Sequence, residues 1–152
     1  MSEAERPHEA YVLAIREQVA QHVASLDELR ERLQSGPLTF IERTATERSL
    51  QIVIEAAIGC TKHLLRAMGR PVPAEARAAI ERVYEATRIA EPPLAELRGA
   101  VGMRNAILHD YLNLDWRLLE KVLAEGRYRR VEAFVDHAAT RLLEAAQDDP
   151  AR

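Results

Sequence analysis

Residues 40–68, which read FIERTATERSLQIVIEAAIGCTKHLLRAM, decide the fold class of this chain. No proline interrupts the stretch, and at the helical period of about 3.6 residues its apolar side chains form two stripes. The first stripe includes Leu50, Ile54, Ile58 and Leu65, and the second includes Ile52, Ala56, Gly59 and His63. A helix that is apolar on two faces is buried on two sides, so we expect it at the centre of a bundle or against a second subunit.

The segments on either side of this stretch also predict helices. Glycine or proline occurs at residues 36–37, 69–73, 92–93 and 126, and the intervals carry apolar residues at spacings of three and four. We expect helices over residues 11–33, 74–90, 94 to about 110–112 and 116–125, and a last helix that runs through residues 131–142, with Asp115 capping the penultimate one. Short connections between such helices predict a single domain over residues 1–152, an up-and-down bundle of four to six helices with a core at about residues 8–145 and frayed ends.

The composition points to the same fold class. Ala, Leu, Glu and Arg supply 80 of the 152 residues, and aromatic residues only 5%, which favours an all-α protein and excludes a β-sandwich or barrel. No stretch is apolar enough to span a membrane, and the first ten residues, MSEAERPHEA, lack the hydrophobic region of a signal peptide. The single cysteine, Cys60, allows no internal disulfide. We therefore expect a cytoplasmic protein with no membrane partner.

Charge is distributed unevenly along the chain. The formal net charge is -3, which is not the value of a general nucleic-acid binder. Residues 1–35 carry seven acidic and four basic side chains, whereas residues 98–130 carry seven basic and four acidic ones. Any phosphate chemistry is therefore expected in the later segment.

Polar side chains are concentrated in residues 102–111, which read GMRNAILHDY. On an ideal helix, with about 100° per residue, Asn105 and His109 lie about 40° apart. Arg104 and Tyr111 lie about 20° apart, and Arg104 diverges from His109 by about 140°. The four side chains are thus expected to flank one broad polar face.

These residue types suit metal-free cleavage of RNA. His109 can act as acid or base near neutral pH, and Arg104 can bind a phosphate through two hydrogen bonds. One histidine is too few to serve as both acid and base, but a twofold-symmetric dimer places two copies of the motif across one cleft. Gly99 and Gly102 just upstream would allow close approach of a neighbouring backbone.

The pattern Arg104-Asn-Ala-Ile-Leu-His109-Asp-Tyr111 resembles the signature of HEPN domains, and more specifically the HepT toxins that pair with the minimal nucleotidyltransferase antitoxin MntA. The text of residues 48–57, RSLQIVIEAA, and the Leu-Asp-Trp of residues 114–116 also match. The resemblance covers about residues 8–145.

This resemblance implies a homodimeric, metal-independent endoribonuclease toxin with a helical-bundle fold. Arg104 and His109 would form a composite catalytic site, with Asn105 as a supporting polar residue. It also implies silencing by the antitoxin, which would transfer AMP from ATP onto Tyr111. The toxin itself would need no cofactor, and its partners would be RNA, the antitoxin and a second copy of the chain.

Alternatives remain open for the same residues. Arg104 and His109 could form a buried polar network that holds the bundle together, and Asn105 could make a hydrogen bond between helices. Tyr111 could be an aromatic anchor at a helix end. The alternative function is a non-catalytic subunit that binds nucleotide or RNA and partners a nucleotidyltransferase.

Residues outside the motif are assigned structural roles. Glu55 is expected to pair with Arg48 rather than to support the cleft, and His22 and His63 are expected in the core or an interface. Residues 127–130, RYRR, are either an RNA-binding patch or a solvated helix start, and we favour the latter. The scattered histidines and single cysteine show no metal-ligand spacing, so no metal is expected.

Overall fold

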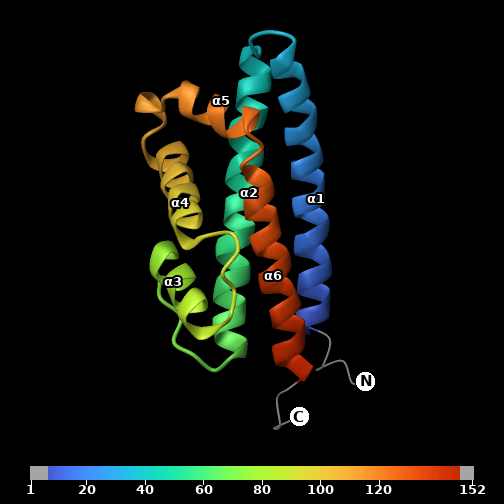
Figure 1. Cartoon of the computed structure of the whole chain (residues 1–152), viewed down its shortest axis with the longest axis vertical. Helices are drawn as coiled ribbons and strands as arrows, with labels where there is room; N and C mark the ends of the chain where they lie inside the picture. Colours follow the sequence, from blue (N-terminus) through green and yellow to red (C-terminus); the bar gives the residue numbers. More distant parts are fainter. Residues whose placement is uncertain (1–6, 148–152) are drawn as a thin grey trace.

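The computed structural model describes residues 7–147 and shows six α-helices and one short 3-10 helix, with no strand in that range (Figure 1). In chain order they are α1 (Pro7–Gln34), α2 (Phe40–Ala67), α3 (Ala76–Ala86), α4 (Leu94–His109), η2 (Tyr111–Asn113), α5 (Trp116–Ala124) and α6 (Tyr128–Gln147). The predicted all-α bundle is confirmed. The ends predicted to be frayed, and the first six residues of the segment predicted to lack a signal region, lie outside the described residues. Between residues 7 and 147, no helix is long and apolar enough to cross a membrane.

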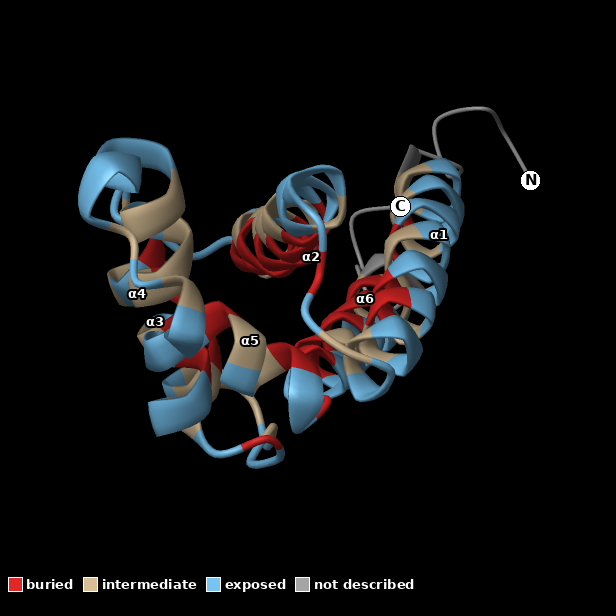
Figure 2. Ribbon diagram, turned by 90° about the horizontal axis from the view of Figure 1, so that it is seen from above, coloured by how far each residue is buried: buried red, intermediate tan, exposed pale blue. Residues whose placement is uncertain are grey.

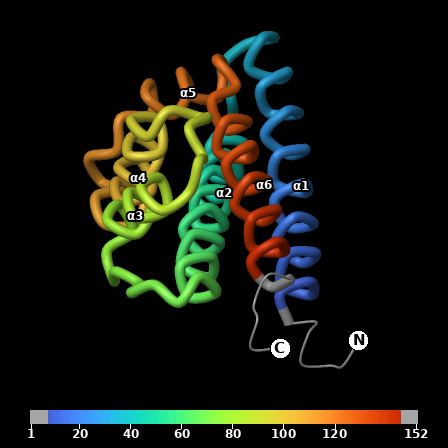
Figure 3. Tube along the Cα trace, turned by 60° about the horizontal axis from the view of Figure 1, so that its bottom comes forward, coloured from blue at the N-terminus to red at the C-terminus, as the bar shows by residue number. Residues whose placement is uncertain are grey.

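Helix α2 is the centre of the bundle. In Figures 1 and 3, α1 and α6 lie on one side of it and α3 and α4 on the other. Helix α2 contacts each of the other five α-helices, and Figure 2 shows buried residues along both α2 and α6. Seven of its side chains have no exposed surface, and most of them lie between the two predicted stripes: Thr46, Val53, Ala57, Cys60, Thr61, Leu64 and Leu65. The expected central position of α2 is therefore confirmed within a single chain. In the second stripe, however, only Ala56 is buried, and Ile52, Gly59 and His63 are half-buried.

Polar contacts fix α6 against α1. The Tyr128 hydroxyl donates to the Asp27 carboxylate, which also pairs with Arg129. Near the other end of the pair, Arg16 forms an ion pair with Asp136, with Nη2 3.0 Å from Oδ1. These contacts join residues more than a hundred positions apart and hold the chain's first and last helices side by side.

The helices end where the sequence places its breakers. Gly69, with φ of 69°, follows α2, and the Arg70 N–H donates to the Leu65 carbonyl at 2.9 Å, a bond that satisfies a carbonyl of the last turn. Gly126 ends α5 with the same backbone conformation. The Asp115 carboxylate caps α5, as predicted.

Helix α3 ends four residues earlier than the predicted residue 90. The Thr87 hydroxyl donates to the Val83 carbonyl at 2.7 Å and accepts from the Ile89 N–H at 3.2 Å. A threonine side chain that bonds to nearby backbone groups offers the chain an alternative to the helix, and here it takes over the last turn.

Candidate active site

The motif of residues 104–111 lies on the last two turns of α4 and in η2. Helix α4 packs against α2 and α3 and is anchored by Leu97 and Val101, each 1% exposed. Arg104 follows Leu97 by seven residues and therefore continues this buried face toward α2. Asn105 and His109 lie on the outward side of the helix and are exposed.

Arg104 is the buried member of the motif. Its side chain is only 16% exposed, and its Nε lies 3.5 Å from Oε1 of Glu55 on α2. The prediction that Glu55 pairs with Arg48 is wrong. Glu55 lies on the side of α2 that packs against α4, so its carboxylate contacts Arg104 instead.

The contact with Glu55 does not satisfy Arg104. Its Nε is buried and has no hydrogen-bond partner among the described residues. A buried donor without a partner is unfavourable, so an acceptor that reached it would gain more than a typical surface hydrogen bond. The Nε of Arg16 is also without a partner, but the Nη2 of Arg16 donates to Thr140 and pairs with Asp136.

His109 is the last residue of α4. The next residue, Asp110, leaves the helical conformation with φ of -141° and ψ of 35°, and its carboxylate accepts from the Asn113 side-chain amide at 2.8 Å. Within residues 7–147, no hydrogen bond or ion pair joins His109 to Arg104. One chain therefore presents an inward arginine and an outward histidine, in keeping with the angle expected from the helix.

Tyr111 lies on the surface of η2, where it is 68% exposed. An aromatic side chain that anchored a helix end would be covered by its neighbours. The exposure instead leaves the Tyr111 side chain open to another molecule.

Exposed apolar side chains occur at the end of α4, in η2 and in α5, and no local pattern predicts their exposure; together they are called the apolar cluster. Its members are Leu108, Tyr111, Leu112 and Leu118, which are 39%, 68%, 84% and 59% exposed. The start of α2, with exposed Phe40 and Ile41, lies at the same end of the molecule as α5 in Figure 1. Exposed apolar side chains gathered in one region are typical of an interaction surface.

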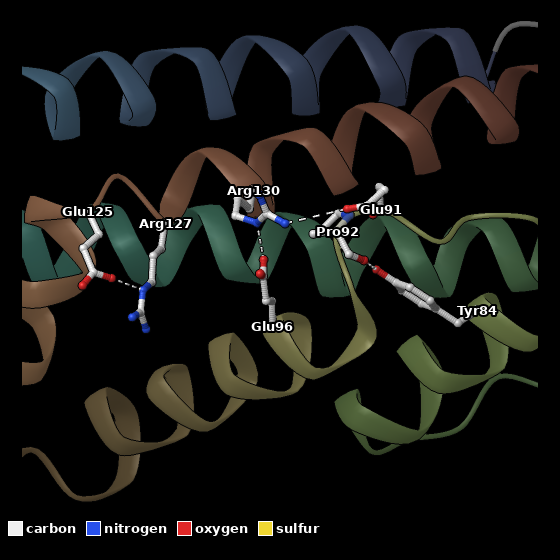
Figure 4. A network of polar contacts seen from close by, with 7 residues as sticks. All are labelled: Tyr84, Glu91, Pro92, Glu96, Glu125, Arg127 and Arg130. Carbon is white, nitrogen blue, oxygen red and sulfur yellow. Dashed lines mark hydrogen bonds and ion pairs between the residues drawn. The ribbon is translucent and has the colours of Figure 1, made fainter.

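A groove of about 670 Å³ lies between α4 and α6 and reaches Met103, the residue before Arg104. Leu50, Val53 and Ile54 of α2 contribute to its apolar lining. Figure 4 shows that its charged rim is internally paired, with Arg127 on Glu125 and Arg130 on Glu96. None of Arg104, Asn105 and His109 lines this groove.

The RYRR segment of residues 127–130 does not form a stacking patch. Tyr128 is 1% exposed, and the three arginines each pair with acidic side chains. The favoured interpretation, a solvated start of a helix, is confirmed for the three exposed arginines but not for Tyr128, which is buried.

His22 and His63, expected in the core or an interface, are half-buried. His22 bonds to Ser49 at 3.0 Å, and His63 stacks on Tyr11 with ring centroids 3.9 Å apart. Burial lowers the pKa of both histidines. Cys60 is fully buried in the core. In the described part of the chain, no three His, Cys, Asp or Glu side chains are grouped closely enough to hold a metal ion.

The two glycines of α4 do not receive a neighbouring backbone, contrary to expectation. The space that a Cβ would take at Gly102 is occupied by the Arg77 guanidinium, and at Gly99 nothing lies within 4 Å. The reason is that the neighbour at this point, α3, contacts α4 through long charged side chains.

A family model described as ribonuclease HepT-like matches residues 17–138. The chain belongs to the HepT-like ribonuclease family. The matched range of this HepT-like chain includes all of α2 and the whole motif from Arg104 to Tyr111.

A solved structure titled "Crystal structure of the toxin-antitoxin with AMP-PNP" contains a chain with the same fold as this HepT-like protein. The two chains superpose with a TM-score of 0.72 at 18% sequence identity, over 91% of this chain and 99% of the other. A search of curated protein sequences finds no match.

Proposed function

We propose that this HepT-like protein is the metal-independent endoribonuclease toxin of a toxin–antitoxin pair. The observation that carries the proposal is the buried and unpartnered Nε of Arg104, which is followed directly by exposed Asn105 and five residues later by exposed His109, in a chain of a ribonuclease family. A phosphate oxygen is an acceptor of the kind that this donor lacks.

The active cleft would be built from two copies of the chain. One motif carries a single histidine, and α4 turns Arg104 to a different side from His109, so one chain cannot supply both an acid and a base to the same phosphate. A twofold axis beside the end of α4 would bring two motifs face to face. The apolar cluster of Leu108, Tyr111, Leu112 and Leu118 is the surface that such a dimer would cover.

The proposed reaction is transesterification. The ribose 2′-oxygen attacks the adjacent phosphorus, the bond from phosphorus to the 5′-oxygen breaks, and a 2′,3′-cyclic phosphate and a 5′-hydroxyl remain. His109 of one copy accepts the 2′-hydroxyl proton, and His109 of the other copy gives a proton to the leaving oxygen. Arg104 offsets the charge that develops on the phosphate, and Asn105 adds a hydrogen bond.

Modification of Tyr111 would switch the toxin off. In the proposed step, the Tyr111 phenol oxygen attacks the α-phosphorus of ATP, a new P–O bond forms and pyrophosphate leaves, catalysed by a nucleotidyltransferase antitoxin. The exposure of Tyr111 supports its access to such an enzyme. The AMP group would place a bulky anion in the cleft where the RNA phosphate binds. The fold neighbour, whose title names a toxin–antitoxin with AMP-PNP, supports the same kind of partner.

The direct test is incubation of the purified protein with total cellular RNA in EDTA. The wild type should cleave RNA and leave cyclic-phosphate ends, whereas Arg104→Ala should not. Arg48→Ala is the matched control, because Arg48 is an exposed arginine of α2 with no ion pair among the described residues. Intact RNA with a wild type whose mass shows unmodified Tyr111 would contradict the proposal and favour a non-catalytic binding subunit.

A Tyr111→Phe variant tests the switch separately. It should cleave RNA as the wild type does but gain no AMP mass when incubated with ATP and the antitoxin. A gain of AMP mass by Tyr111→Phe would place the modification on another residue.

A further inference from the structure

Arg77 of α3 rests on the motif helix at the position of a glycine. Its Nη2 lies 2.9 Å from the point that a Cβ would occupy at Gly102, closer than real Cβ contacts allow. Any residue other than glycine at position 102 would therefore displace this guanidinium. Because the displaced group is the end of a flexible side chain, the fold would tolerate the change.

The contact follows from the way α3 and α4 pair. Glu81 of α3 bonds to Arg98 of α4 at 2.8 Å, and Arg77 lies one turn before Glu81 while Gly102 lies one turn after Arg98. The two helices are thus antiparallel, and each turn of α3 meets one turn of α4. In this register, the N-terminal end of α3 lies nearest the C-terminal half of α4, which carries the motif.

Arg77 and Arg98 differ in their electrostatic environment. Arg98 is neutralised by Glu81, whereas exposed Arg77 has no hydrogen bond or ion pair to any residue in the described range 7–147. A guanidinium held against a backbone without an acidic partner is available to an external anion.

The position of Arg77 relates it to the proposed catalytic residues. Gly102, Asn105 and His109 lie on one side of α4, within about 60° of each other, and all are at least partly exposed. Gly102 and His109 are separated by about 10.5 Å along the helix axis. An RNA strand that followed this side of α4 from His109 would pass Arg77 at a phosphate other than the scissile one.

We propose that Arg77, seated on Gly102, binds a phosphate of the RNA strand next to the cleavage site, and that Gly102 is a glycine in order to leave room for it. This inference rests on the proposed ribonuclease function and extends its substrate site from α4 to α3. Arg77 then contributes to RNA affinity without sequence preference, since a phosphate contact carries no base information.

The test measures binding of a fluorescent single-stranded RNA of mixed sequence to the full chain carrying His109→Ala, which prevents cleavage during the measurement. Adding Arg77→Ala should weaken binding about three- to tenfold at low salt. It should also reduce the slope of log Kd against log salt concentration by about 0.7, the value for one phosphate contact on a single strand. Arg82→Ala is the matched control, because Arg82 is an exposed arginine of α3 that contacts neither Gly102 nor, within residues 7–147, an acidic partner.

A double-mutant cycle tests the role of the glycine. Gly102→Ala should weaken RNA binding in a chain with Arg77 but have no further effect in Arg77→Ala, and it should not lower the melting temperature. Equal Kd values for Arg77→Ala and Arg82→Ala would overturn the inference. A Gly102→Ala effect of the same size with and without Arg77 would overturn it as well.

Failure of this inference is distinguishable from failure of the proposed function. If the wild type cleaves RNA and Arg77→Ala binds RNA with the same Kd as Arg82→Ala, the proposed ribonuclease function is supported and the Arg77 phosphate site is overturned. If the wild type does not cleave RNA but Arg77→Ala weakens RNA binding more than Arg82→Ala does, the Arg77 site is supported and the protein is a non-catalytic RNA-binding protein. If the wild type neither binds nor cleaves RNA, both are overturned.

Discussion

Helix α2 and the C-terminal end of α4 differ in whether their polar side chains find hydrogen-bond partners and their apolar side chains are buried. The buried side chains of α2 are apolar except for Thr46, Ser49 and Thr61, and each of these three makes a hydrogen bond within the chain. The end of α4 buries the Nε of Arg104 without a partner and exposes apolar side chains such as Leu112. The first region is complete within one chain, whereas the second lacks an acceptor and an apolar cover that another molecule can supply.

The difference predicts that substitutions in the two regions change different properties. His109→Ala should lower the rate of RNA cleavage by about 10²–10⁴, the usual effect of removing a positioned acid or base. Since His109 is exposed, the melting temperature of the His109→Ala variant should match that of the wild type. Single-turnover cleavage and thermal melting measure the two quantities. Wild-type cleavage by a folded His109→Ala protein would remove this residue from the mechanism.

A substitution in the interior should have the reverse effect. Leu65 of α2 has no exposed surface, and Leu65→Ala should lower the free energy of unfolding by about 2–5 kcal/mol through lost burial and the cavity left behind. Leu13→Ala is the control, because this 70% exposed leucine of α1 lies outside the apolar cluster and should change stability by no more than about 0.5 kcal/mol. Denaturant unfolding measures both. Similar unfolding free energies for the two variants would show that α2 is not the core.

Glu55 joins the two regions, and its replacement should have an intermediate effect. Glu55→Gln removes the carboxylate that holds Arg104, so kcat should fall by up to about 10²-fold through misplacement of the guanidinium. The pair is partly exposed, so its loss should change stability by only about 0–1 kcal/mol. Glu81→Gln breaks a comparable pair with Arg98 and should leave kcat unchanged. Equal kcat values for both variants would mean that Glu55 does not position Arg104.

The smallest expected effect concerns pH and the interface between α1 and α2. Burial and the nearby charge of Arg48 lower the pKa of His22 in the folded state. The unfolded chain therefore binds more protons as pH falls through about 6.5, and the stability that depends on neutral His22 is present above this pH and lost below it. His22→Gln should flatten the dependence of melting temperature on pH between about 5 and 7. An unchanged pH dependence would assign the effect to other groups.

The sequence predicted the helices better than it predicted the contacts between them. Apolar periodicity and helix-breaking residues are local signals, so the sequence alone predicts the central place of α2 and the helix ends marked by Gly69 and Gly126. The pairing of Arg104 with Glu55 depends on the register between α2 and α4, which no local pattern records. In the same way, Gly102 predicts that another group lies close to α4, but the sequence does not show that this group is the Arg77 side chain.

The central claim is that the α4 ends of two copies form one ribonuclease cleft in which both His109 side chains act. Wild-type protein and His109→Ala can be mixed in equal amounts, unfolded, refolded together and assayed for RNA cleavage. If both histidines are needed, only wild-type homodimers are active, and the activity should be about a quarter of that of the same total amount of wild type. An activity of about one half would contradict the claim, because each chain would then act with its own histidine alone.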